Sequence, residues 1–135
     1  MNVIVDTCVW SYALRRQPAA NAAVVDELQV LIMAFRVQML GVIRQEILSG
    51  IRSDAQFAQL KTLLRSFPDR PVLTEDYERA AEYFNLCRSK GIQGSNTDFL
   101  ICAVAVRTQH LIYTTDRDFE HYARYLPIRL YQSGH

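Results

Sequence analysis

The chain opens with VIVDT at residues 3–7, in which three β-branched apolar residues precede an acid and a hydroxyl residue. A short run that is apolar throughout is typical of a central strand covered on both faces, as in a parallel sheet. Apolar strand-like runs then alternate with helix-period segments along the chain, which predicts an α/β fold. We therefore expect a three-layer α/β/α sandwich around a central parallel sheet of about five strands.

The expected strands share an apolar, partly β-branched composition and lie at residues 3–5, 37–40, 72–73, 111–113 and 128–131. Apolar residues at a spacing of three to four predict helices between them. The segment 96–107 is apolar nearly all round, so we expect its helix to be buried. A length of 135 residues fits a single domain over residues 1–135.

Composition and residue spacing exclude several classes of protein. Hydrophobic residues make up 50% of the chain and charged residues 21%, which is a globular composition. The longest apolar run, residues 99–106, is far shorter than a membrane helix, and residues 1–6 lack the pattern of a signal peptide. The cysteines show no C-x-x-C spacing and the histidines no H-E-x-x-H pairing, which argues against a disulfide framework and a zinc site. We therefore expect a cytoplasmic protein without membrane contact.

Five acids share a position at the carboxyl edge of the expected sheet, where strands end and the following helices begin. They come from four separate parts of the chain and are Asp6, Glu46, Asp98, Asp116 and Asp118. Ligands of open parallel sheets bind at this edge. Neighbouring carboxylates raise one another's pKa, and a hard divalent cation would neutralise them. Since all of these ligands are oxygen atoms, they favour Mg²⁺ or Mn²⁺.

Each acid also has a purely structural interpretation. Asp98 fits a capping box begun by Ser95, and the acids at 116 and 118 can cap the helix that follows them. Glu46 can pair with Arg44 or Arg52 at the surface. These interpretations together do not account for five acids at one edge with no lysine among them.

Four segments together resemble a PIN-domain nuclease, and most closely a VapC-type ribonuclease toxin of bacterial toxin–antitoxin pairs. They are VIVDT at 3–7, RQEILSG at 44–50, Asp98 at the head of an apolar helix, and TTDRDF at 114–119. The resemblance covers the whole chain and keeps the order and spacing of the motifs. It implies an α/β/α sandwich, a Mg²⁺- or Mn²⁺-dependent endoribonuclease, and a cognate antitoxin that blocks it. It also implies RNA products with 5′-phosphate and 3′-hydroxyl ends.

The same resemblance assigns roles to individual residues. The catalytic acidic quartet would be Asp6, Glu46, Asp98 and Asp116. The metal ligands would be Asp6, Asp98, Asp116 and Asp118. Thr7 and Thr114 match polar positions that support the site. Cys8 departs from the small polar residue common in the family, which puts a hydrogen bond from that side chain in doubt.

The charge balance leaves room for an RNA-binding surface. The net charge is only +1, but removing the five site acids leaves 9 acids against 15 basic residues, a net charge of +6. Thirteen of the basic residues are arginines, whose forked guanidinium suits phosphate. Arg44 and Arg117 neighbour site residues and are the expected phosphate contacts, with solvated surface charges as the plain alternative.

A partner surface is also expected. The helix through residues 30–35, together with Trp10 and Tyr12, carries more apolar residues than one buried stripe needs. We interpret the excess as a groove or homodimer face on which an antitoxin helix could lie, with core packing as the alternative.

Other functions fit the sequence less well. A haloacid-dehalogenase-type phosphatase would need a second acid two residues after Asp6, where Cys8 stands. A receiver domain would need an acidic neighbour of Asp6 and a late lysine, and no lysine follows Lys90. Two alternatives to a toxin stay open: a PIN nuclease of RNA processing, and a non-catalytic PIN-like module that binds protein or RNA.

Overall fold

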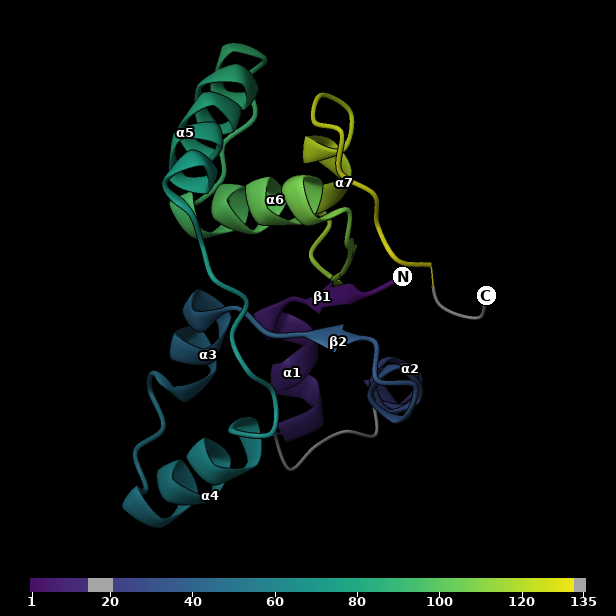
Figure 1. Cartoon of the computed structure of the whole chain (residues 1–135), viewed down its shortest axis with the longest axis vertical. Coiled ribbons are helices and arrows are strands. Elements are labelled where there is room, and N and C mark those ends of the chain that lie inside the picture. The colour runs from purple at the N-terminus through teal and green to yellow at the C-terminus, as the bar shows by residue number, and fades with distance from the viewer. Residues whose placement is uncertain (15–20, 133–135) are drawn as a thin grey trace.

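The computed structural model describes residues 1–14 and 21–132, and it confirms the predicted α/β class. A parallel sheet lies between two groups of helices, with α5 and α6 on one side and α1 and α2 on the other (Figure 1). In chain order the elements are β1 Val3–Val5, α1 Thr7–Leu14, α2 Ala22–Met33, β2 Val37–Gln38, α3 Gly41–Leu48, α4 Asp54–Leu64, α5 Thr74–Ser89, α6 Asn96–Thr108, β3 Leu111–Tyr113 and α7 Asp118–Tyr122.

The described residues form a sheet of three parallel strands in the order β2-β1-β3, fewer than the five or so expected. The segments 72–73 and 128–131 contain no regular strand; near them the chain makes only single bridges, Met39 to Asp69 and Ile112 to Leu130. At the second of these segments the pairing is short, because only the Ile112 N–H and the Tyr131 N–H donate across it, to the Arg129 and Ile112 carbonyls at 3.0 and 2.7 Å. The core sheet is therefore small, with β1 at its centre.

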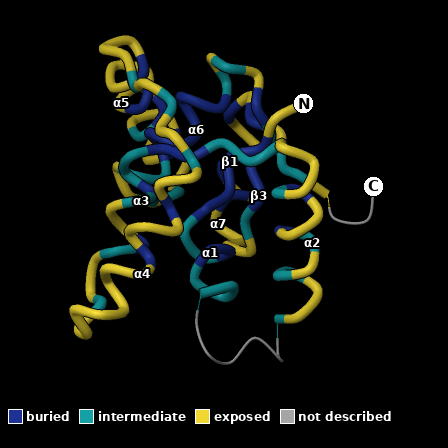
Figure 2. The backbone as a smooth tube through the Cα atoms, turned by 60° about the horizontal axis from the view of Figure 1, so that its bottom comes forward, coloured by how far each residue is buried: buried dark blue, intermediate teal, exposed yellow. Residues whose placement is uncertain are grey.

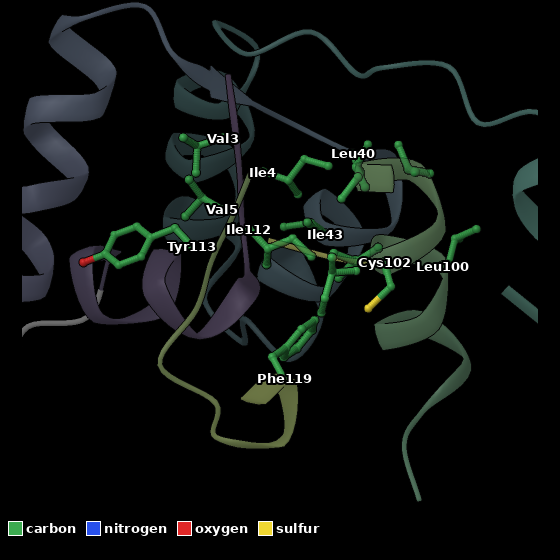
Figure 3. Close-up of a cluster of buried hydrophobic side chains, with 14 of the residues drawn as sticks. Val3, Ile4, Val5, Leu40, Ile43, Leu100, Cys102, Ile112, Tyr113 and Phe119 are labelled. Carbon is green, nitrogen blue, oxygen red and sulfur yellow. The ribbon is translucent and has the colours of Figure 1, made fainter. Parts of the chain in front are cut away.

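Alternate residues of the strands face opposite helical layers. Ile4 and Ile112 point to one side of the sheet, toward Cys102 of α6, whereas Val5 and Tyr113 point to the other (Figure 3). On that second side the Tyr113 hydroxyl donates a hydrogen bond to a backbone carbonyl of α2, at 3.2 Å. Both faces of β1 are thus covered, as its unbroken apolar sequence predicts.

Helix α6 is the central helix of its layer. Every residue from Phe99 to Ala105 is buried, which confirms the expectation drawn from its apolar sequence. Figure 2 shows α6 and β1 mostly in the buried class, while the outer turns of α2 and α5 are exposed. The helix begins at Ser95, whose side chain accepts a hydrogen bond from the Asp98 N–H at 3.0 Å, and it ends at Gln109 in the left-handed region.

A buried ion pair fixes α5 against the far end of α6. Asp76 accepts hydrogen bonds from the Arg107 guanidinium at 2.7 and 2.9 Å and from the Leu73 N–H at 2.9 Å. Burial opposes ionisation of Asp76, but these hydrogen bonds and the charge of Arg107 outweigh it and hold the pKa below its usual value.

The predicted partner surface is only partly where the sequence placed it. Trp10 belongs to the core, where its ring packs edge-on against Phe67 at 5.2 Å between centroids. Val30, Met33 and Phe35 are exposed, and Phe35 follows the end of α2 in the left-handed region with 92% of its surface accessible. A hollow of about 290 Å³ lies beside Phe35. The core-packing alternative therefore holds for Trp10, and the exposed apolar face is confined to the end of α2.

Cys8, Cys87 and Cys102 are free thiols, and burial raises the pKa of Cys87 and Cys102. Across the helices of residues 1–14 and 21–132, none combines the length and the apolar character needed to cross a membrane.

Candidate active site

The site begins where β1 and β3 end side by side. Val5 lies opposite Tyr113 in the parallel register, and the Asp6 N–H donates to the Tyr113 carbonyl at 2.9 Å. The next residues of the two strands, Asp6 and Thr114, are thereby brought together. The Thr114 hydroxyl donates to Oδ2 of Asp6 at 2.8 Å, and Asp6 is 7% exposed.

Thr7 joins Asp6 to Glu46. Its backbone N–H donates to Oδ1 of Asp6 at 2.8 Å, and its hydroxyl donates to Oε1 of Glu46 at 2.7 Å. Glu46 is exposed and comes from α3, the helix that follows β2. Both oxygens of the Asp6 carboxylate therefore accept hydrogen bonds, which fixes its orientation.

The loop after β3 and the start of α7 add two further exposed acids, Asp116 and Asp118. The Asp116 N–H donates to the Thr114 hydroxyl oxygen at 3.0 Å, and the Asp118 N–H donates to Oδ1 of Asp116 at 2.9 Å. A continuous chain of hydrogen bonds consequently links residues that lie far apart in the sequence, namely Glu46, Thr7, Asp6, Thr114, Asp116 and Asp118.

Asp98 approaches this chain from the first turn of α6. Burial raises the pKa of its carboxyl, and the negative charges of Asp6 and Asp116 raise it further, against opposing hydrogen bonds from Tyr122 and Ser95. The charges of Asp6 and Asp116 thus act on Asp98, which agrees with its place at the same edge of the sheet. The expected cap also exists, because Ser95 caps the helix as described above. Only the Ser95 half of the predicted capping box is present, because the Asp98 N–H donates to Ser95 while the Asp98 carboxylate accepts its hydrogen bond from Tyr122.

Sequence reasoning missed Tyr122, whose hydroxyl donates to Oδ2 of Asp98 at 2.8 Å. Burial and this hydrogen bond raise the pKa of Tyr122, so the hydroxyl keeps its proton. Tyr122 follows Phe119 by three residues, which places both on one face of a helix, and a buried tyrosine hydroxyl needs a polar partner. That reasoning could have predicted Tyr122 to be a buried tyrosine with a hydrogen-bond partner, but it could not have identified Asp98 as the partner.

Cys8 also takes part in the hydrogen bonding. Its thiol donates to Oδ2 of Asp6 at 3.5 Å, and the Thr115 hydroxyl donates to the Cys8 sulfur at 3.3 Å. The departure from the family pattern therefore leaves a polar contact with Asp6 in place.

The two arginines expected to contact phosphate differ. The Arg44 guanidinium donates to Asp69 at 2.9 and 3.1 Å, to the Leu64 carbonyl at 2.9 Å and to the Phe67 carbonyl. Arg44 thus fastens α3 to the end of α4, and it pairs with Asp69 instead of Glu46. Arg117 is exposed between the two acids of the final motif.

The carboxylates are suitable ligands for a hard cation, but their side chains are not arranged as a ready-made metal site. Within residues 1–14 and 21–132, no three His, Cys, Asp or Glu side chains are grouped so that they could hold a metal ion as they stand. The side chains gathered at this edge nevertheless offer carboxylate oxygens, the ligand type that Mg²⁺ and Mn²⁺ prefer.

The chain matches one family model and shares its fold with several solved structures. Residues 3–125 match the family model described as the PIN domain. Three solved structures share the fold: FitAcB from Neisseria gonorrhoeae (20% identity, 96% of each chain, TM-score 0.70); VapBC2 from Rickettsia felis bound to a promoter DNA fragment (17% identity, 97% of this chain and 98% of that one, TM-score 0.74); and FitAB bound to the IR36 DNA fragment (20% identity, 98% and 99%, TM-score 0.79). No curated protein matches the chain.

Proposed function

The chain belongs to the PIN domain family, and from that premise we propose that it is a metal-dependent endoribonuclease toxin neutralised by a cognate antitoxin. One observation carries the proposal: hydrogen bonds through Thr7 and Thr114 link Glu46, Asp6, Asp116 and Asp118 at the carboxyl edge of the sheet, and the charges of Asp6 and Asp116 act on Asp98. Two points support the toxin part of the proposal. The sequence motifs resemble VapC-type toxins, and the fold is similar to the structures of VapBC2 and FitAB. We expect it to act in the cytoplasm.

The residues divide the chemistry among them. Asp6, Asp98, Asp116 and Asp118 would hold the Mg²⁺ or Mn²⁺ ion, which when bound supplies a Lewis acid for the scissile phosphate and an activated water. Thr7 and Thr114 hold the Asp6 carboxylate in one orientation through their hydrogen bonds.

Glu46 and Arg117 complete the proposed catalytic set. One oxygen of Glu46 is bound to Thr7, and the exposed side chain leaves the other to accept a proton from the attacking water. Arg117 is exposed in the loop of the final motif, where its guanidinium can reach a phosphate of the RNA.

The exposed apolar end of α2 supports a protein partner. Val30 and Met33 are exposed in the last turns of α2, and Phe35, just after its end, is exposed and lines the hollow. We propose that an antitoxin helix covers this face, with a second copy of the chain as the alternative. Met33→Glu should weaken the antitoxin complex in a titration without changing RNA cleavage. If Met33→Glu dissociates a homodimer instead, the face belongs to the second copy.

RNA cleavage tests the nuclease directly. Protein freed of antitoxin should cut a labelled RNA with Mg²⁺ or Mn²⁺ and stop in EDTA, leaving 5′-phosphate ends. Asp6→Asn should remove the activity, whereas Asp26→Asn, at an exposed acid of α2, should keep it. Undiminished cleavage in EDTA with 2′,3′-cyclic ends would contradict the metal mechanism.

A second function has one observation in its favour. Because no three side chains of the described chain are preset to hold a metal, a non-catalytic PIN-like module is the alternative. Titration with Mn²⁺ separates the two, since a module that only binds protein or RNA should take up no ion at the carboxylates.

A further inference from the structure

Tyr122 touches the carboxylate cluster without being an acid. Its ring is completely buried, and its hydroxyl donates to Oδ2 of Asp98 at 2.8 Å. The two residues come from α7 and α6, which the same core packs together. This is a polar contact between the core and the candidate active site.

Packing fixes the place of the hydroxyl independently of Asp98. The Tyr122 ring packs against the rings of Phe99 and Phe119, at 4.8 and 5.1 Å between ring centroids. A fully buried tyrosine packed in this way has little freedom to move its hydroxyl. The ring therefore acts as a rigid support for the oxygen at its tip.

Gly94 makes space for that support. A Cβ atom at Gly94 would stand 2.3 Å from the Tyr122 hydroxyl oxygen and 2.8 Å from the ring carbon that carries it. Both distances are shorter than a non-bonded contact allows. With any residue other than glycine at this position, the contact between residue 94 and the Tyr122 ring would have to shift.

We propose that Tyr122 is a positioning residue of the metal site: its hydroxyl holds Oδ2 of Asp98, so that the carboxylate would be oriented for binding the ion, and Gly94 leaves the space this requires. The inference rests on the proposed function. A hydrogen bond from an outer partner orients a metal ligand, and its loss typically weakens metal affinity or activity by roughly 10–100-fold.

Tyr122→Phe tests the proposal, because it removes the hydroxyl and keeps the ring. We expect Mn²⁺ binding, measured by calorimetry on the full chain, to weaken by roughly 10–100-fold. The kcat of RNA cleavage should fall with it, while KM for RNA stays the same. Melting temperatures in EDTA confirm that the variant is folded.

Tyr113→Phe is the matched control. Tyr113 is also buried, and its hydroxyl also donates one hydrogen bond, but to a backbone carbonyl of α2 on the other side of the sheet. The control should lose stability without losing Mn²⁺ affinity. Gly94→Ala provides a second variant, in which the hydroxyl remains but is displaced, and it should weaken Mn²⁺ binding as Tyr122→Phe does.

The outcomes distinguish this inference from the proposed function. If the wild type binds Mn²⁺ and Tyr122→Phe binds it equally well, Tyr122 has only a structural role and the inference is overturned. If the wild type binds no Mn²⁺, the proposed function fails and the inference falls with it.

Discussion

An aspartate lies at each end of α6: Asp98 in its own first turn, and Asp76 of α5 beside its last turn. The pKa values of the two aspartates are shifted in opposite directions. At one end, Asp76 is paired with the cationic Arg107, and its pKa lies below the usual value. At the other end, Asp98 receives a hydrogen bond from the neutral Tyr122 and faces Asp6 and Asp116. Its pKa is raised by burial and by those charges.

The difference lies in what balances the negative charge. Arg107 neutralises Asp76, so that pair joins two helices and has no charge left for a ligand. Tyr122 orients Asp98 without neutralising it, so the charge stays available for a cation. A carboxylate held in place but not neutralised is what a metal site needs, and the following experiments test whether the two ends differ in this way.

The largest effect is expected from Asp98→Asn. Cleavage should fall on the order of 10³-fold, the scale found when a catalytic electrostatic group is removed. Stability in EDTA should stay the same or rise, because repulsion among the carboxylates is relieved. The gain in melting temperature that Mg²⁺ gives the wild type should shrink. A destabilised protein with near-normal cleavage would show that Asp98 is only a helix-capping acid.

Arg107→Ala should have the converse effect at the other end. It leaves Asp76, which is 2% exposed, without its partner. We expect a loss of about 3 kcal/mol, the lower end for buried pairs, since Arg107 itself is 32% exposed. Urea unfolding measures the loss, and cleavage per folded molecule should not change. A fall in cleavage would mean that the two ends of α6 are not independent.

Ser95→Ala should cost about 1 kcal/mol of stability, because it removes the side chain that caps α6. Ser53→Ala is the matched control, since Ser53 caps α4 by accepting a hydrogen bond from the Gln56 N–H at 3.2 Å. Both variants should lose similar stability in thermal unfolding. Only Ser95→Ala should also reduce cleavage, because the cap fixes the turn that carries Asp98. Equal cleavage by the two variants would show that the Ser95 cap does not influence the candidate site.

The smallest effect is a difference in pH dependence, measured in EDTA. Asp76 has a lowered pKa, so the stability it contributes is present above the unfolded value of about 3.9 and is lost as the pH falls through its folded pKa. Asp98 has a raised pKa, so its ionisation costs stability, and this cost disappears as the pH falls from neutral through its folded pKa. Stability of the wild type relative to Asp98→Asn should therefore rise on mild acidification. A flat difference would contradict the raised pKa of Asp98, which burial and the neighbouring charges produce.

The sequence predicted what depends on local pattern. The run at residues 3–5 formed β1, and the apolar segment 96–107 formed the buried α6 with Asp98 in its first turn. The acids were expected at the carboxyl edge because strand ends define that edge, and the hydrogen bonds that link Glu46, Asp6 and Asp116 there agree.

The remaining features depend on contacts with residues far away in the sequence, which a local pattern cannot identify. Arg44 stands two residues from Glu46, yet its guanidinium binds Asp69, which lies 25 residues further along the chain. Trp10 appeared as surplus apolar surface because the ring that covers it, Phe67, comes from a distant segment. The number of strands was overestimated because the apolar runs at 72–73 and 128–131 are too short for regular pairing, and the chain near them makes single bridges.

The position of β1 in the middle of the sheet determines when the site can form. The hydrogen bond from Thr114 to Asp6 joins residues separated by 108 positions, and it depends on β3 lying beside β1. Contacts between such distant residues form late in folding, since a long loop must close first. On the ribosome, β1 and β2 can meet long before β3 is made. Asp6 and the acids at 116 and 118 therefore stay apart until residues 111–116 have emerged, so the candidate site cannot assemble on the nascent chain before then.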